Sequence, residues 1–167
     1  MSSGNLSNAL SRRRIAVTGA PGFVGTALVE RLLRVVPDCE LVLLVRDGKR
    51  TPAARRTQRE ILKNDAFDRL RDMHGDDFET AVASRITTVA GDVTRDGRGL
   101  SDADRDVFAS CTTIIHSAAA VSFDSPLDSA VEINLLGPTR ITALCRDLGI
   151  APHLVAVSTC YVAGNRR

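Results

Sequence analysis

The chain lacks the features that define several large classes of protein. It has no apolar run of the ~18 residues that a membrane-spanning helix requires. Its 22 basic and 20 acidic residues leave a formal net charge of only +2, which is too small to indicate binding to nucleic acid or to an anionic membrane surface. The 44% hydrophobic and 25% charged residues over 167 positions are instead typical of one soluble globular domain with a sizeable core.

The cysteines and histidines also lack the spacing that is typical of metal ligands. The four cysteines form no CxxC pair and the three histidines are scattered, so the sequence indicates no metal site. Buried thiols in a reducing compartment are the simpler interpretation. Residues 1–13 are rich in Ser and Asn and lack the apolar core of a secretory signal. We therefore predict that residues 1–13 form a disordered arm and that the protein is cytoplasmic.

The most informative stretch is IAVTGAPGFVG (15–25), in which an apolar strand runs into three spaced glycines and then into an amphipathic helix. A tight turn, a close approach of backbone to a pyrophosphate and a close contact of helix with strand each exclude a β-carbon. The helix would also direct free N–H groups and its positive dipole end at the phosphates. A merely structural glycine turn is the alternative. The pattern predicts a dinucleotide-binding turn whose contacting residues are Thr18, Gly19, Pro21, Gly22, Phe23, Val24 and Gly25.

Strand and helix patterns alternate along the rest of the chain. This alternation predicts an α/β fold, a doubly wound parallel sheet of the Rossmann type, with residues 14–167 forming the NAD(P)-binding domain. Continuous apolar runs at 41–45 and 112–115 are typical of central strands covered on both faces. The strands are expected near 15–18, 40–45, 86–90, 112–116 and 153–158, and the helices near 23–35, 52–72, 102–109 and 126–148.

Two of the expected helices have unusual features. The connection over 46–85 is far longer than a minimal crossover and holds a polar, basic helix from Pro52 to Met73. Its charges belong either to a solvated helix face or to contacts with adenosine phosphates or a CoA group. The helix over 126–148 contains Gly137-Pro138, and because proline has no backbone N–H we expect a kink there.

Arg46 follows the second expected strand, where an NAD enzyme would place a carboxylate on the ribose 2′-hydroxyl. A guanidinium can bind a 2′-phosphate through two charge-assisted hydrogen bonds, and Lys49 or Arg50 would add positive charge. The sequence therefore favours NADPH over NADH. Two alternatives stay open, since Asp47 could pair with a ribose hydroxyl and Arg46 could be an ordinary surface charge.

The ends of the next two strands also carry candidate cofactor contacts. Asp92 and Val93 follow the third strand, where a carboxylate and a backbone N–H could reach the edge of an adenine ring, although an Asx turn would explain the same residues. His116, Ala118 and Ala119 close the fourth strand, and the small side chains there would let a flat cofactor lie against the backbone.

The whole pattern resembles the extended short-chain dehydrogenase/reductases. The glycine turn, Gly91-Asp92, the Asn134 helix sequence INLLG (133–137) and VST (157–159) carry this resemblance. The similarity is greatest to the fatty acyl-CoA reductase and thioester reductase branch. Three features single out that branch, namely the insertion with ILKNDAFDRL (61–70), the HxAAxVxF spacing of HSAAAVSF (116–123), and the Ser-Thr-x-Tyr-Val sequence ending at Val162.

The resemblance implies NADPH as the cofactor and an acyl-CoA or carrier-bound acyl thioester as the substrate. The thioester carbonyl would accept hydride to give an aldehyde, or an alcohol after a second reduction. Catalysis in that family uses a Ser or Thr after the fifth strand and a Tyr-x-x-x-Lys pair. By family position the hydroxyl is that of Thr159, with Ser158 second. Asn134 matches an asparagine thought to orient the lysine through water, or it is a satisfied buried amide.

The chain departs from the family at the Tyr-x-x-x-Lys pair. Its only tyrosine, Tyr161, is followed four positions later by Asn165, and no lysine follows Lys63. We therefore expect an amino-terminal portion of a reductase, truncated after the fifth strand and inactive as it stands. The helices that should cover residues 154–157 would then be absent, and the exposed sheet is expected to lower stability or to cause self-association.

Two other functions are compatible with the sequence. Another extended family member, such as a sugar epimerase, a dehydratase or a hydroxysteroid dehydrogenase, shares the glycine turn and the catalytic groups but has less need of the long basic insertion. A non-catalytic module could also bind a nucleotide, or a partner at its exposed sheet edge, without any reductase role.

Overall fold

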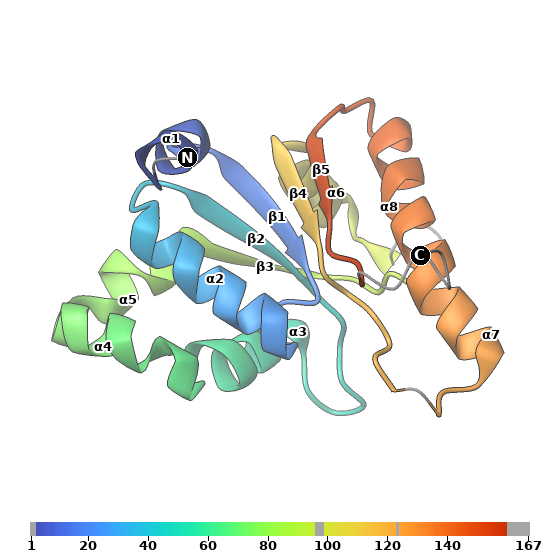
Figure 1. Ribbon diagram of the computed structural model, residues 1–167, viewed down its shortest axis with the longest axis horizontal. Helices are drawn as coiled ribbons and strands as arrows, with labels where there is room; N and C mark the ends of the chain where they lie inside the picture. The colour runs from blue at the N-terminus through green and yellow to red at the C-terminus, as the bar shows by residue number, and fades with distance from the viewer. Residues whose placement is uncertain (1–2, 96–98, 123, 160–167) are drawn as a thin grey trace, which may run out of the picture.

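The computed structural model describes residues 3–95, 99–122 and 124–159. Within these residues five parallel strands form one sheet in the order β3-β2-β1-β4-β5 (Figure 1). β2 and β3 therefore lie on one side of β1, and β4 and β5 lie on the other. This is the doubly wound Rossmann arrangement, so the expected fold class is confirmed. The strands are β1 (Arg14–Thr18), β2 (Glu40–Val45), β3 (Ile86–Ala90), β4 (Thr113–His116) and β5 (His153–Ala156).

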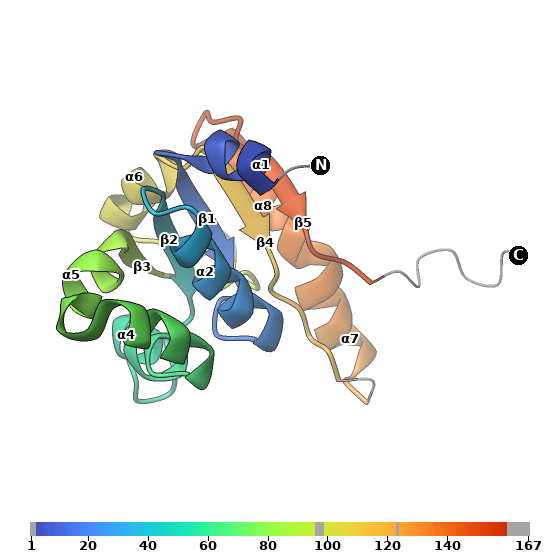
Figure 2. The same ribbon diagram turned by 60° about the vertical axis from the view of Figure 1, so that its left-hand side comes forward.

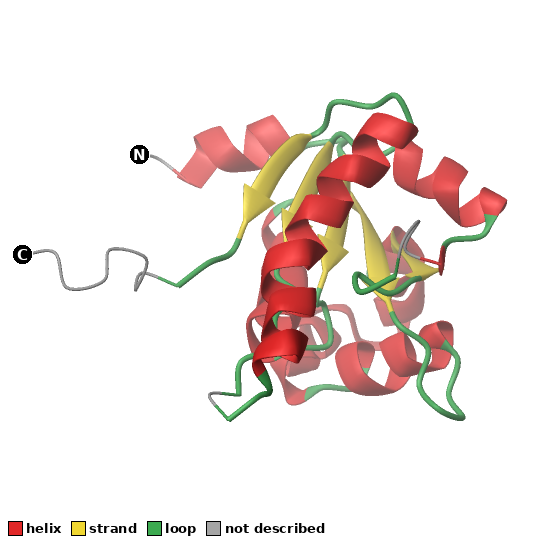
Figure 3. Ribbon diagram, turned by 90° about the vertical axis from the view of Figure 1, so that its right-hand side faces the viewer, coloured by secondary structure: helices red, strands yellow, loops and turns green. Residues whose placement is uncertain are grey.

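Helices cover both faces of the sheet because successive strand residues point to opposite sides. Ile15 and Val17 of β1 pack into one apolar cluster with α2 (Phe23–Val35) and the insertion. Ala16, between them, packs into the other cluster with α6 (Asp102–Ala109) and α8 (Leu136–Asp147). Figure 3 shows α8 crossing the near face of the strands, with the helices of the insertion behind the sheet.

The insertion between β2 and β3 is a series of short helices, so the single helix expected over 52–72 is wrong. Asn64 ends the first part, since its Oδ1 accepts a hydrogen bond from the N–H of Ala66 at 3.0 Å. Phe67 follows this turn and lies in the core at 0% exposure. The pieces are α3 (Ala53–Arg56), a π-helical segment (Thr57–Leu62), a 3-10 turn (Asp65–Phe67), α4 (Asp68–His74), a second 3-10 turn (Gly75–Asp77), α5 (Phe78–Ala81) and a third 3-10 turn (Ala83–Arg85).

The helix expected over 126–148 is present with a local irregularity. α7 (Leu127–Ala130) passes into a π-helical segment (Val131–Leu135), and this segment passes into α8. Pro138 has no N–H to donate to the carbonyl four residues earlier, so regular α-helical bonding is interrupted at the position where the sequence predicts a kink.

The amino-terminal arm differs from the expectation of disorder, because the structure contains α1 (Ser3–Leu10). The hydroxyl of Ser7 donates to the carbonyl of Val35 at 2.8 Å, and Leu10 packs against the core cluster under α2. The bond from Ser7 to the end of α2 and the packing of Leu10 hold the segment at the edge where the strands begin (Figure 2). A polar composition alone did not reveal them.

β5 is an exposed edge strand, as expected from the sequence. All four of its residues are exposed, with Leu154 at 38% and Val155 at 39%, and Val157 just beyond it is 45% exposed. Apolar side chains on an unpaired edge are a site of association between chains. Self-association itself stays a prediction. In the described part of the chain, no helix combines the length and apolar character needed to cross a membrane.

Candidate nucleotide-binding site

The glycine turn lies at the carboxyl end of β1, where the strand order reverses and α/β sheets bind their ligands. Gly19 has φ of +72°, and a β-carbon there would lie 2.6 Å from the N atom of Ala118 in the loop after β4. A β-carbon on Gly25 would lie 2.1 Å from the carbonyl oxygen of Gly19. The turn is thus pressed against both the following helix and the neighbouring loop, and only glycine fits at these two positions.

The first turn of α2 is open to a ligand. Gly22 is the N-cap and provides no side-chain cap, while the first helical bond runs from the N–H of Thr26 to the carbonyl of Gly22 at 2.8 Å. The N–H groups of the first turn have no helical acceptor, so an anion placed there would receive them. Phe23 is 94% exposed and Val24 is 51% exposed, so apolar side chains border the same end. This cradle fits the pyrophosphate of a dinucleotide.

Thr18 and His116 lie beneath the turn, with side chains 0% and 4% exposed. The Oγ1 of Thr18 is 2.8 Å from Nδ1 of His116, and it accepts from the N–H groups of Ser117 at 3.3 Å and Ala118 at 3.2 Å. Its hydroxyl proton is therefore directed at Nδ1, which places the ring proton of neutral His116 on Nε2. Burial lowers the pKa of His116 and favours this neutral form. The pair ties the glycine turn to the loop after β4.

The residues predicted to contact the adenosine lie at the ends of β2 and β3. Asp47 accepts a hydrogen bond at Oδ1 from the N–H of Ala53 at 2.8 Å, so this carboxylate holds the start of α3. Arg46 is exposed, and among the described residues its side chain has no ion pair or hydrogen bond. The alternative in which Asp47 turns toward a ribose is therefore disfavoured by its existing bond.

Asp92 forms the Asx turn that was the alternative interpretation of this residue. Its Oδ1 accepts from the N–H of Thr94 at 2.9 Å and from the Thr94 hydroxyl at 2.8 Å. Burial opposes ionisation of Asp92, but these hydrogen bonds and the positive charges of Arg46 and Arg95 outweigh it and hold the pKa below its ordinary value. Val93 is 8% exposed, with its side chain in the second apolar cluster. A contact of Asp92 or Val93 with adenine stays a prediction.

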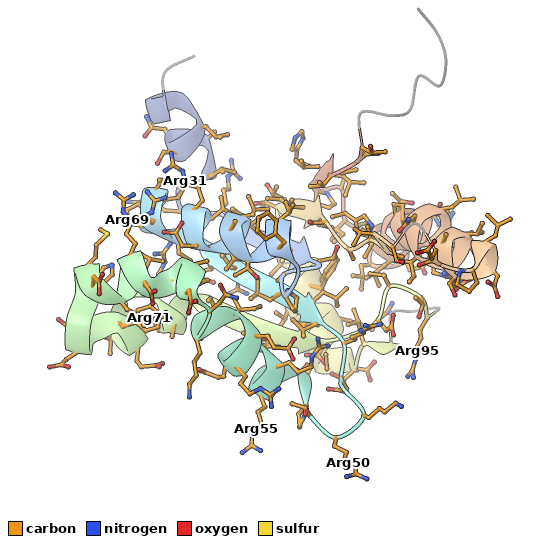
Figure 4. The ribbon with its side chains drawn as sticks, turned by 60° about the horizontal axis from the view of Figure 1, so that its bottom comes forward. Arg31, Arg50, Arg55, Arg69, Arg71 and Arg95 are labelled. Atoms are coloured by element: carbon orange, nitrogen blue, oxygen red, sulfur yellow. The ribbon has the colours of Figure 1, made fainter. Side chains whose placement is uncertain are left out.

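Basic side chains surround this end of the molecule. Figure 4 shows Arg50 at the tip of the loop after β2, with Arg55 also directed outward and Arg95 on the loop after β3. Lys49 lies in the same exposed loop as Arg50. These charges give the adenosine side a positive field, while Arg46 is the basic residue that directly follows β2.

The loop after β4 is held by Asn134, which the sequence left as either a lysine-orienting residue or a satisfied buried amide. Its Oδ1 accepts from the N–H of Ala120 at 2.8 Å, and its Nδ2 donates to the carbonyl of Ala120 at 3.0 Å. The amide is satisfied, but the residue is exposed rather than buried. Ala118 and Ala119 lie in the loop held in this way. Sequence reasoning did not predict this pairing, because the two residues are far apart in the chain.

Ser158 and Thr159 follow β5 after one intervening residue, Val157, and both are exposed. Their position brings hydroxyl groups to the edge of the sheet that carries the glycine turn. Tyr161 and Asn165, where the sequence departs from the Tyr-x-x-x-Lys pattern, fall outside the described residues. Among the residues that the structure describes, no cluster of His, Cys, Asp or Glu could hold a metal ion.

The insertion supplies one wall of a hollow beside the glycine turn, which the sequence did not predict. The hollow has a volume of about 210 Å³ and lies against the open end of α2. Asn64 and Ala66 of the insertion line this hollow together with residues of the glycine turn. The lining residues are Pro21, Gly22, Phe23, Thr26, Ala27, Asn64 and Ala66.

Comparison with known proteins decides the family. The family model described as Male sterility protein matches residues 17–167. The chain belongs to this family. Fatty acyl-CoA reductase 1 of Arabidopsis thaliana is 32% identical over 161 residues, covering 94% of this chain and 33% of the relative. Fatty acyl-CoA reductase 1 of Rattus norvegicus is 31% identical over 156 residues, covering 93% of this chain and 29% of the relative. The chain thus spans about a third of the length of these family members.

Solved structures agree with this assignment. The terminal R domain from the myxalamid PKS-NRPS biosynthetic pathway is 28% identical with a TM-score of 0.66, and the match covers 89% of this chain and 35% of that domain. The Bordetella bronchiseptica enzyme WbmG in complex with NAD is 21% identical with a TM-score of 0.61, over 92% of this chain and 40% of that enzyme, and shows the shared fold. The resemblance to the reductase branch of the extended short-chain dehydrogenase/reductases is confirmed.

Proposed function

We propose that this NAD(P)-binding chain is the NADPH-binding part of a reductase that acts on acyl thioesters. The cofactor assignment rests on the availability of the Arg46 side chain. Its exposed guanidinium directly follows β2, while the neighbouring carboxylate of Asp47 is already bonded to Ala53. A 2′-phosphate at the end of β2 would find a positive group to bind, whereas turning the Asp47 carboxylate toward a bare 2′-hydroxyl would cost the bond that holds the start of α3.

The remaining residues have roles that follow from their positions. The open first turn of α2 binds the pyrophosphate, and the glycines allow the close approach that this binding needs. Bound across these strand ends, the nicotinamide would supply hydride to the thioester carbonyl carbon. Thr159, with Ser158 as the second candidate, would donate a hydrogen bond to the carbonyl oxygen and stabilise its developing negative charge. Asn134 holds the loop after β4 along which the cofactor lies.

Two similarities support the acyl thioester as substrate. The curated relatives are named fatty acyl-CoA reductases, and the 28% identical solved structure is the terminal R domain of a PKS-NRPS biosynthetic pathway. An acyl-CoA and a carrier-bound acyl thioester present the same reacting carbonyl, so both belong to the proposal. The proposal places the chain in a reducing compartment such as the cytoplasm, where its buried thiols at Cys39 and Cys111 would stay reduced.

The cofactor assignment is tested by binding. The chain has no tryptophan, so the fluorescence of NADPH and NADH can be followed on titration with protein. We expect NADPH to bind at least about tenfold more tightly than NADH, and Arg46→Met to remove most of that difference. Arg50→Met is the matched control, because it removes the same charge from the loop tip (Figure 4). Equal affinity for the two cofactors, or an Arg46→Met variant that keeps the preference, would contradict the proposal.

The substrate class needs a separate measurement. NADPH oxidation is followed with palmitoyl-CoA and with a nucleotide sugar, using this chain and any longer product of the same reading frame. We expect this chain to bind NADPH without turnover, since it has no Tyr-x-x-x-Lys sequence. Oxidation that requires palmitoyl-CoA supports the thioester reductase. Turnover of the nucleotide sugar instead would place the protein with the epimerases and dehydratases.

A further inference from the structure

Arg56, in the first part of the insertion, connects that insertion to the end of β2. Its Nη1 donates to the carbonyl oxygen of Arg46 at 2.8 Å. Its Nε and Nη2 donate to the two carboxylate oxygens of Glu60 at 2.9 and 2.7 Å. The two side chains are 17% and 32% exposed, so this bidentate pair is shielded from water more than an ordinary surface pair.

Glu60 is a potential competitor for the group that would bind the 2′-phosphate. Hydrogen bonds from Arg56 hold the pKa of Glu60 below its ordinary value despite burial, and the positive charges of Arg59 and Arg46 act in the same direction. Arg46 therefore lies within electrostatic range of this carboxylate. With Arg56 in place, both oxygens of Glu60 are occupied by Arg56, and Arg46 keeps its own donors.

The surrounding contacts fix Arg56 relative to the sheet. Thr57 is 3% exposed, and its Oγ1 accepts a hydrogen bond from the hydroxyl of Thr88 on β3 at 2.9 Å. Asp47 holds the start of α3, the short helix that ends at Arg56, by accepting a hydrogen bond from the N–H of Ala53. The π-helical segment begins at the residue after Arg56, and such segments often mark functional positions. The start of the insertion is thus attached to both β2 and β3.

From this geometry we infer that Arg56 is a positioning residue for cofactor selection. It holds the backbone of Arg46 in place and occupies Glu60, which leaves the Arg46 guanidinium available for the 2′-phosphate of NADPH. The inference rests on the proposed NADPH function and assigns the basic insertion a part in that function. Arg56 acts through Arg46 and need not touch the cofactor.

The test compares NADPH and NADH binding to variants of the whole chain. Arg56→Met removes the guanidinium and leaves Glu60 free to pair with Arg46, so NADPH affinity should fall about tenfold while NADH affinity changes less than about twofold. Adding Glu60→Gln to this variant removes the competing carboxylate and should return NADPH affinity to within about threefold of the unmodified chain. Arg55→Met, which removes an outward-pointing arginine one residue away, is the control for charge (Figure 4).

The outcomes separate this inference from the function on which it rests. If the unmodified chain does not prefer NADPH, the proposed function fails. If it prefers NADPH but Arg56→Met keeps that preference or weakens both cofactors equally, only the positioning role is overturned. Circular dichroism and thermal melting check that each variant folds. Glu60→Gln alone gives an independent result should Arg56→Met unfold, since retained or higher NADPH affinity supports the inference and a clear loss overturns it.

Discussion

Replacing Thr18 by valine tests whether the buried network under the glycine turn stabilises the fold. Valine keeps the shape of threonine but removes Oγ1, which faces Nδ1 of His116 and the N–H groups of Ser117 and Ala118. The Ser117 N–H also donates to the carbonyl of Thr18 at 3.2 Å and so keeps a partner. The buried Nδ1 of His116 and the half-buried N–H of Ala118 lose their partner. At about 1–3 kcal/mol for the buried ring nitrogen and about 1 kcal/mol for the partly exposed N–H, we expect a loss of about 2–4 kcal/mol.

This loss is a large part of the ~5–15 kcal/mol by which domains are usually stable. Urea unfolding followed by circular dichroism measures it, because the chain has no tryptophan to report on unfolding. With a slope of about 2 kcal/mol per molar urea, the midpoint should fall by about 1–2 M. Thr18→Ser keeps the hydroxyl and should cost only about 1 kcal/mol for the lost methyl group. A valine variant as stable as the serine variant would refute the assigned network.

Three further results are expected. Gly25→Ala should lower the free energy of unfolding by about 3 kcal/mol or more in thermal melts, because its β-carbon would lie 2.1 Å from the Gly19 carbonyl, whereas Gly22→Ala at 3.2 Å should cost about 1 kcal/mol. Burial lowers the pKa of His116 on folding, so the unfolded chain binds a proton at this ring more readily. The contribution of neutral His116 to stability should therefore be complete above about pH 6.5 and should fall below it. Urea midpoints measured against pH should show this slope, and His116→Gln should remove that part of it. Val155→Lys should shift the protein toward monomer in sedimentation experiments, and an unchanged, concentration-independent mass in both proteins would exclude association through β5.

Local patterns predicted most of the fold because each expected strand carries its own apolar signal. The glycine turn of 19–25 was predictable for the same reason, since its spacing and its flanking strand and helix are contiguous in sequence. The helix over 52–72 was predicted as continuous because its polar pattern gives no sign of the turn at Asn64, after which Phe67 enters the core. α1 was missed because its support comes from the distant end of α2.

In the candidate site, too, some residues were predictable from the sequence and some contacts were not. Arg46 was identified from its place after an apolar run, but the commitment of Asp47 to Ala53 and of Glu60 to Arg56 required the folded insertion. Nothing in the chain order indicates that Asn134 would pair with the backbone of Ala120.

The sequence by itself determined the alternation of strands and helices of an α/β fold, the glycine turn and the charge at the end of β2, since these depend on residues close together in the chain. The tertiary structure alone decided which polar groups are already bonded and which remain available to a ligand. The physical reason is that a hydrogen-bond partner is chosen by distance in space, and folding brings together groups such as Thr18 and His116 that are 98 positions apart.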